Sequence, residues 1–324
     1  MSQALVTIGL TTYNAADTLE RALESALSQT WKPVEIIIVD DCSTDGTVAL
    51  LKRLAHDLPQ VRVLFNTING GVAIARNRIL NEARGDFVVY FDDDDESFPD
   101  RIEKQVQRIM KYEEDFGISA PVICHTARTL IYPDGARQVA PTMGQDESRV
   151  APFGINVARR ILLGRPLRDG YGGCPTCSQM ARLSTYRMLG GFDSSLRRSE
   201  DTDLNIRLAL AGGHFVGIAE PLVTQFMTRT NEKSLAEEYR NMLLLMQKHQ
   251  SFMKAEGQYE FCLEWLAVKQ HWLERRKGSF VQSLAGLALT RPWHTFVRLY
   301  QSVRSFSINL TFSRFHRNLG EREL

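Results

Sequence analysis

The chain has 324 residues, of which 44% are hydrophobic and 24% charged, values that are ordinary for a globular protein. This length allows one large α/β domain with an appendage, or two domains. No uncharged apolar run reaches about 18 residues, which excludes a transmembrane helix, and the N-terminus lacks the basic region of a secretory signal.

The charge is unevenly distributed along the chain. Residues 269–324 contain ten Lys and Arg but three Glu, a local charge of +7, whereas the whole chain carries +1. This asymmetry predicts a basic tail that meets an anionic surface, lipid or nucleic acid, while the rest does something else. The five cysteines, in a chain without an apparent signal, favour reduced thiols and a cytoplasmic setting.

The first part of the chain alternates apolar runs with segments of helical periodicity. Strands are expected at residues 5–10, 34–39, 61–65 and 87–91, with helices at 19–27, 47–58 and 72–83 between them. Such alternation predicts βαβ units and a parallel sheet. The segment TTYNAAD follows the first strand where a dinucleotide-binding protein would have a Gly-x-Gly-x-x-Gly turn, which argues against a dehydrogenase.

Four carboxylates, Asp92 to Asp95, follow the fourth apolar run directly. They would lie at the C-terminal edge of the sheet, where open α/β sheets bind ligands. If the extended conformation continues, Asp92 and Asp94 share one side, and carboxylates of this kind bind Mg²⁺ or Mn²⁺. The alternative is a solvated acidic turn, which is what clusters of acidic residues most often form.

In the second part of the chain, the expected strands and helices do not alternate regularly. We expect a helix at 98–114, a hairpin at 122–132 and 137–140, a helix at 153–163, strands at 177–183 and 215–218, and a helix opened by Glu200 and Asp201. From about residue 235 the pattern is helical. Trp293, Phe296 and Tyr300 recur at helical spacing among basic residues, so this helix either docks on protein or lies on a membrane surface.

Five segments together resemble family 2 glycosyltransferases of the GT-A fold. They are TTYNAADTLERALESALSQT, IIIVDDCSTDGT, GGVAIARNRILNEARGDFVVYFDDDD, GGFD and SEDTDLNIRLALAGG, within residues 4–225. The resemblance implies a Rossmann-like, mostly parallel sheet with helices on both faces, plus a C-terminal helical extension. We therefore expect a GT-A glycosyltransferase domain at 1–230 and a basic helical extension at 231–324.

The resemblance also implies roles for individual residues. Thr11 and Tyr13 would line the nucleoside pocket, Asp41 would bind the base, Arg76 and Asn77 would lie beside the nucleotide, Asp92 and Asp93 would bind the nucleotide-sugar, Asp94 with Asp92 would bind the metal, and Asp201 would be the catalytic base. The implied cofactor is Mn²⁺ or Mg²⁺.

The implied reaction is inverting transfer of a hexosyl or N-acetylhexosaminyl group in the synthesis of a bacterial surface polysaccharide. The donor would be a nucleoside-diphosphate sugar, UDP-linked by preference, and the acceptor a hydroxyl of a glycan or lipid-linked glycan. The resemblance implies no nucleic-acid partner and a cytoplasmic enzyme, peripheral at the inner membrane. The alternative is a non-catalytic nucleotide-sugar-binding subunit of a glycan assembly complex.

Overall fold

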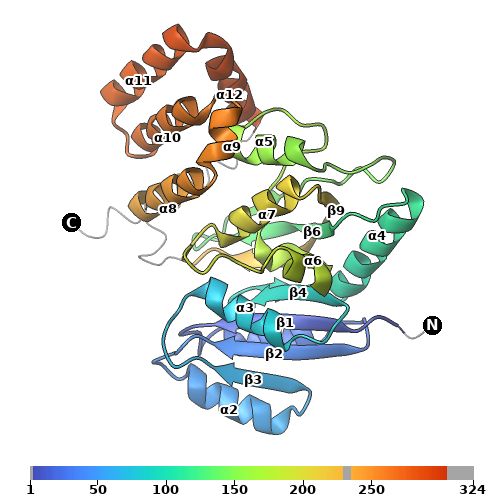
Figure 1. The fold of residues 1–324 in the computed structure, drawn as a ribbon. Coiled ribbons are helices and arrows are strands. Elements are labelled where there is room, and N and C mark those ends of the chain that lie inside the picture. The colour runs from blue at the N-terminus through green and yellow to red at the C-terminus, as the bar shows by residue number, and fades with distance from the viewer. Residues whose placement is uncertain (1–2, 229–234, 305–324) are drawn as a thin grey trace. The chain divides into compact units, whose positions relative to one another are not determined.

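The computed structural model describes residues 3–228 and 235–304 (Figure 1). The chain divides into two compact units. One contains the described residues of Met1–Ile155 and Arg168–Met227, and the other those of Asn156–Leu167 and Thr228–Leu324. The expected boundary between residues 230 and 231 falls outside the described residues and stays a prediction, as does the part of the basic tail beyond residue 304.

The first unit is built on a sheet whose N-terminal strands are all parallel. Its strands β1 (Val6–Thr12), β2 (Val34–Asp40), β3 (Val61–Phe65) and β4 (Phe87–Asp92) lie in the order β3-β2-β1-β4. The interiors of β1, β2 and β4 are almost wholly buried, as their continuous apolar runs predicted, whereas the edge strand β3 is only partly buried. Because Thr11 pairs with both Val39 and Asp92, the carboxyl ends of these three strands meet at one edge.

The other half of the sheet is mixed in direction. Strand β8 (Gln179–Arg182) runs antiparallel to β4 and to β6 (Val122–Ile131), and β6 pairs in parallel with β9 (His214–Phe226). The predicted hairpin is confirmed, since β7 (Arg137–Ala140) pairs antiparallel with β6. A two-residue strand, β5 (Glu96–Ser97), pairs with β9 and delays the next helix, α4 (Arg101–Asp115), which was expected to begin at residue 98.

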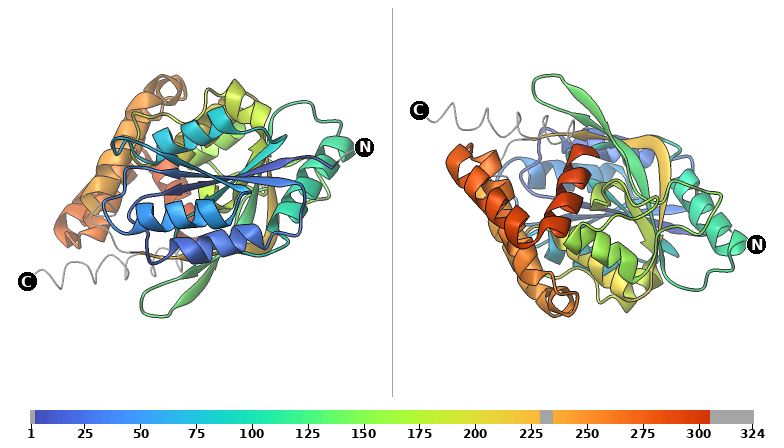
Figure 2. Two further views of the ribbon diagram at one scale, coloured as in Figure 1. Left: turned by 90° about the horizontal axis from the view of Figure 1, so that it is seen from below. Right: turned by 90° about the horizontal axis from the view of Figure 1, so that it is seen from above.

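Helices cover both faces of this sheet (Figure 2). On one face, α1 (Leu19–Leu27), α2 (Thr47–Asp57) and α4 share a hydrophobic core with the strands, for example through Leu23, Leu51 and Ile109. The other face carries α3 (Val72–Glu82), α6 (Leu183–Met188) and α7 (Glu200–Leu210). This layering is the expected doubly covered α/β arrangement.

The second unit is helical. It contains most of α5 (Ile155–Leu163), followed by α8 (Leu235–Lys248), α9 (Gln250–Ala255), α10 (Tyr259–Leu273), α11 (Lys277–Thr290) and α12 (Pro292–Arg304). Glu256 joins its two chain segments, because it pairs with Arg159 at 2.8 Å and Arg165 at 2.9 Å. Among the helices described, none has the length and apolar character needed to cross a membrane.

Candidate active site

The acidic cluster does not continue as a strand. Strand β4 ends at Asp92, and the Asp95 amide donates to the Asp92 carbonyl at 3.4 Å, so Asp93 and Asp94 lie in a turn. The strand-like alternation expected for the four acids therefore does not apply. Asp93 Oδ2 accepts a hydrogen bond from the Tyr13 amide at 3.1 Å, which ties the acidic turn to the segment after β1.

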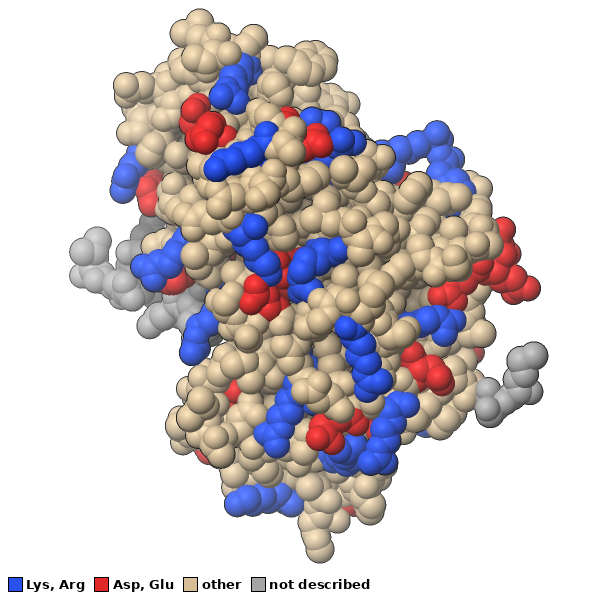
Figure 3. All heavy atoms as spheres, in the orientation of Figure 1, with Lys and Arg blue, Asp and Glu red and all other residues tan. Residues whose placement is uncertain are grey.

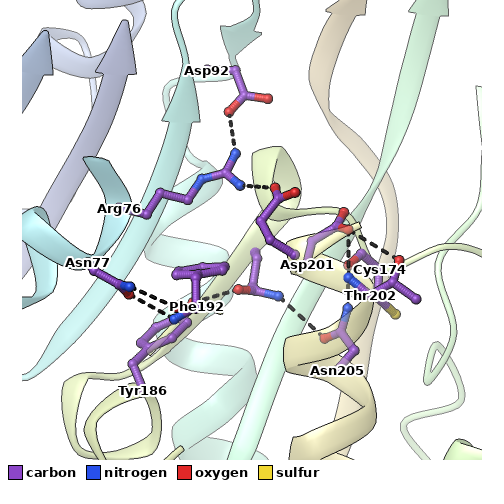
Figure 4. A network of polar contacts seen from close by, with 11 residues as sticks. Arg76, Asn77, Asp92, Cys174, Tyr186, Phe192, Asp201, Thr202 and Asn205 are labelled. Atoms are coloured by element: carbon purple, nitrogen blue, oxygen red, sulfur yellow. Dashed lines mark hydrogen bonds and ion pairs between the residues drawn. The ribbon is translucent and has the colours of Figure 1, made fainter. Parts of the chain in front are cut away.

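Arg76 connects the acidic turn to the start of α7 (Figure 4). Its guanidinium is buried, lies 3.2 Å from Asp92 Oδ1 and pairs with the Glu200 carboxylate. The rings of Tyr90 and Phe192 lie 5.8 and 5.5 Å from it. Burial by itself would lower the pKa of Arg76, but Glu200 and Asp92 outweigh it and raise the pKa. The guanidinium thus stays charged and holds two chain segments together.

Asn77 holds the turn that precedes α7. Its Nδ2 donates to the Phe192 carbonyl at 2.7 Å, and the Phe192 amide donates back to its Oδ1 at 2.8 Å. Arg207 reinforces the same turn by donating to the Gly191 carbonyl at 2.8 Å. Both ends of the Asn77 amide are therefore used in positioning this turn, a role that its expected place beside the nucleotide did not suggest.

Replacement of Gly191 by Ala should destabilise the protein more than replacement of Gly190. Both glycines have φ near +72°, where an added Cβ costs about 1–2 kcal/mol. At Gly191 the new Cβ would also meet Asn77 Oδ1 at 2.4 Å, whereas Gly190 faces open space. Denaturant unfolding of the two variants measures the difference, which should be about 1 kcal/mol or more. Equal losses would contradict the positioning role of Asn77.

Asp201 lies in the first turn of α7, directly after Glu200. Ser199, which precedes the helix, has φ +62°, an uncommon conformation for a residue other than glycine that often marks functional sites. Asp201 Oδ1 accepts from the Thr202 amide at 2.6 Å and the Thr202 hydroxyl at 3.2 Å. The sheet edge and α7 therefore meet through Arg76 and Glu200.

Asp41 is buried and hydrogen-bonded to the segment before α3. Its Oδ1 accepts from Asn66 Nδ2 at 2.7 Å and from the Gly70 amide at 3.1 Å, and its Oδ2 from the Gly71 amide at 2.7 Å. Thr11 lies near the end of β1, beside Asp92 in the sheet. Tyr13 follows that strand with 46% of its surface exposed, so its ring is available to a ligand.

The cluster contains donors that fit a divalent cation. Ligand atoms of Asp92, Asp95 and Cys177 lie within 4.8 Å of one another. Asp95 is buried, and its Oδ2 has no hydrogen-bond partner among the described residues. Carboxylates suit Mn²⁺ and Mg²⁺, whereas the thiol suits softer ions. Asp94 lies in the turn after β4, and its expected role as a metal ligand stays a prediction.

The electrostatics of the turn also fit a cation. Burial, with Asp92 and Asp94 adding to it, raises the pKa of Asp95 well above its usual range. Burial and the neighbouring Asp94 raise the pKa of Asp93 to about 7. A bound divalent cation would offset this crowding of negative charge. The sequence analysis gave Asp95 no role beyond its place among the four acids, and it did not predict that Cys177 would lie here.

Comparison with known proteins identifies the family. A family model described as "Glycosyl transferase family 2" matches residues 7–174. The chain belongs to glycosyl transferase family 2. The family domain thus includes the first four strands, the acidic turn and Arg76, and the predicted family is confirmed.

Two similar curated relatives of this family 2 chain are bacterial. It is 32% identical over 215 residues to the glycosyltransferase EpsE of Bacillus subtilis, covering 65% of this chain and 68% of that one. It is 42% identical over 103 residues to the succinoglycan biosynthesis protein ExoO of Rhizobium meliloti, covering 32% and 29%. The alignment to ExoO thus spans less than a third of that relative.

Solved structures confirm the GT-A-like fold. Staphylococcus aureus TarS 1–349 has a TM-score of 0.57 at 17% identity, covering 98% of this chain and 91% of that one. The Pyrobaculum calidifontis mannosyltransferase PcManGT, in complex with GDP-Man and Mn²⁺, has a TM-score of 0.55 at 17% identity, covering 98% and 85%. At this identity the likeness concerns the fold, which the family 2 chain shares over most of its length.

Proposed function

We propose that the protein is an inverting glycosyltransferase that moves a sugar from a nucleoside-diphosphate sugar to a hydroxyl of a glycan or lipid-linked glycan. The observation that carries this proposal is the Arg76 bridge, which joins the acidic end of β4 to the helix bearing Asp201. A donor-side metal site and an acceptor-side base are thereby held on one rigid connection. UDP is the preferred nucleotide, and structures of TarS in complex with UDP and UDP-GlcNAc support that choice.

The donor nucleotide would lie along the carboxyl edge of β1, β2 and β4. Thr11 and the exposed ring of Tyr13 line the nucleoside pocket, and Asp41 accepts from the ring N–H of the base. Asp92 and Asp93 bind the sugar and ribose side of the donor. Arg76 and Asn77 support this donor site, because their polar groups already bind Asp92, Glu200 and Phe192. This edge is where open α/β sheets bind ligands.

Mn²⁺ or Mg²⁺ would be held by Asp94 and Asp92, with Asp95 and the donor phosphates close by. When bound, the cation stabilises the negative charge that develops on the departing nucleoside diphosphate. Asp92 contributes an oxygen whose position Arg76 fixes, so it does not have to reorganise during the reaction.

Asp201 would act as the general base. Its Oδ2 takes the proton of the acceptor hydroxyl while the hydroxyl oxygen of the acceptor forms a bond to the anomeric carbon. The bond between the anomeric carbon and the nucleoside diphosphate breaks on the opposite face of the sugar. Thr202 fixes the carboxylate by donating two hydrogen bonds to Oδ1. Attack from the opposite face inverts the anomeric configuration.

Calorimetric titration with UDP tests the donor and metal assignments together. UDP should bind the wild type with Mn²⁺ present. Asp94→Ala should weaken that binding at least about tenfold, because mutating even a residue that only hydrogen-bonds to a metal ligand lowers metal affinity by about 10–100-fold. dTDP and GDP serve as nucleotide controls, and Asp57→Ala, at an exposed site on α2, as the matched variant. Equal UDP affinity with and without Mn²⁺ would contradict the metal role.

We further propose that the basic C-terminal helices bring the enzyme to an anionic membrane surface, at the cytoplasmic face of the membrane where a lipid-linked acceptor would be met. Lys and Arg near such a surface contribute about 1 kcal/mol each. The density of positive charge in residues 269–324 supports this placement.

A further inference from the structure

The helical unit contains a cavity of about 430 Å³ that none of the roles above uses. It lies between the segment after α5 and helices α10 and α12. Its walls combine apolar side chains, including Phe261, Trp293 and Val297, with the cationic Arg165 and Arg298. No carboxylate is among the described residues that line it. The cavity therefore combines positive charge with an apolar wall.

The two guanidiniums differ in how far they are satisfied. Arg165 is paired with Glu256 at 2.9 Å. Arg298 Nη2 donates to the Leu162 carbonyl at 3.2 Å, but its buried Nε finds no acceptor within the part of the chain that is described. A buried donor without a partner calls for an acceptor from outside. Burial, then Arg291 and Arg165, lower the pKa of His294, another lining residue, so the local field favours an anion.

The cavity adjoins an exposed aromatic face of α12. Trp293, Phe296 and Tyr300 recur at i, i+3 and i+7 and are 70%, 60% and 57% exposed. The rings of Trp293 and Phe296 stack with centroids 6.0 Å apart. Trp293 belongs to both features, because it also lines the cavity. Aromatic side chains with a polar edge are typical of the boundary between membrane and water.

We propose that this cavity binds the phosphate of an anionic lipid while the aromatic face of α12 lies in the membrane interface. The inference rests on the proposed membrane contact and specifies its site. A free phosphate would need only the guanidiniums, whereas the apolar wall and the exposed rings offer contacts to the hydrocarbon of a lipid. Figure 3 shows Lys and Arg side chains interspersed with Asp and Glu over the visible face.

Vesicle co-sedimentation tests the site on the full chain. Phosphatidylglycerol in phosphatidylcholine vesicles should bind the wild type better than phosphatidylcholine alone. Arg298→Gln should weaken binding about tenfold, the effect of losing a hydrogen bond to a charged group, and Trp293→Ala should weaken it similarly. Arg240→Gln on α8 and Trp272→Ala on α10 remove the same groups at exposed positions outside the cavity and should leave binding unchanged.

The outcomes separate the alternatives. Equal losses for cavity and control variants would overturn the cavity but keep a general membrane contact. No binding of the wild type to anionic vesicles, with UDP binding intact, would overturn both. Binding of inorganic phosphate by a wild type that does not bind anionic vesicles would assign the cavity to free phosphate instead.

A second readout covers the case in which Arg298→Gln unfolds the helical unit, since Arg298 also bonds to Leu162. Lipids brominated on the acyl chain should quench wild-type tryptophan fluorescence. That quenching should persist in Trp272→Phe and be lost in Trp293→Phe, and its persistence in Trp293→Phe would contradict the proposed orientation.

Discussion

Replacing Asp201 by Asn is expected to lower kcat by about 10²–10⁴-fold, the usual contribution of a general base. The amide is similar in shape to the carboxylate but cannot take the proton of the acceptor hydroxyl. UDP affinity with Mn²⁺ should stay nearly unchanged, because the proposed donor site lies at the sheet edge and reaches α7 only through Arg76 and Glu200. Steady-state kinetics and calorimetry on the same protein separate the two effects.

Asp201→Glu is the matched variant for this test. It keeps the carboxylate but moves it by one methylene, so it should recover part of the lost turnover. Substantial turnover in Asp201→Asn would remove Asp201 from the role of base. A wild type that binds UDP but transfers no sugar to any tested acceptor would favour the non-catalytic subunit instead.

Replacing Arg76 by Met is expected to lower the free energy of unfolding by about 3–5 kcal/mol, the cost of removing one partner from a buried ion pair. The Met side chain fills similar volume but leaves the carboxylates of Glu200 and Asp92 without their counter-charge. Arg53→Met is the matched control. Arg53 forms a surface pair with Glu20 and should matter by about 1 kcal/mol or less.

The loss in Arg76→Met should also depend on pH. Burial raises the pKa of Glu200 already in the wild type, Asp201 adds to this, and Arg76 opposes it. Without Arg76 the pKa of Glu200 in the folded state rises further above its value in the unfolded state. The loss of unfolding free energy should therefore grow as pH rises from about 5 to about 8, and shrink at lower pH as Glu200 takes up a proton. Denaturant unfolding at both pH values measures it. A loss as small as that of Arg53→Met, or one independent of pH, would contradict this account.

Strands β1, β2 and β4 could be predicted from sequence because each is a short apolar run buried on both faces, and β3, at the edge of the sheet, was predicted although it is only partly buried. Only the beginning of strand β9 was predicted, at residues 215–218, because its solvent-exposed middle and Pro221 interrupt the apolar pattern that marks this beginning. Helix α6 was missed for a related reason. It has six residues, too few for a helical period to stand out.

The residues of the candidate site were recognisable from their motifs, but their contacts were not. Asn77 and Phe192 are separated by 115 positions, and nothing local in either segment indicates that they bond. The approach of Cys177 to Asp92 and Asp95 likewise depends on how β8 and the short helix before it pack beside β4. Local pattern predicts which elements form, whereas these contacts are decided by how the elements pack.

The pairing of β8 with β4 bears on the order in which the molecule can assemble. The strands β1 to β4 are joined by βαβ connections within the first 92 residues, and β1, β2 and β3 pair across short separations, whereas β4 pairs with β1 across 81 positions. Strand β8 joins them from about 90 positions further on, and Glu200 reaches Arg76 across 124. Closing such long loops costs more entropy. We therefore expect a nascent chain to form the sheet edge with the acidic turn first and to acquire Glu200 and Asp201 of α7 late.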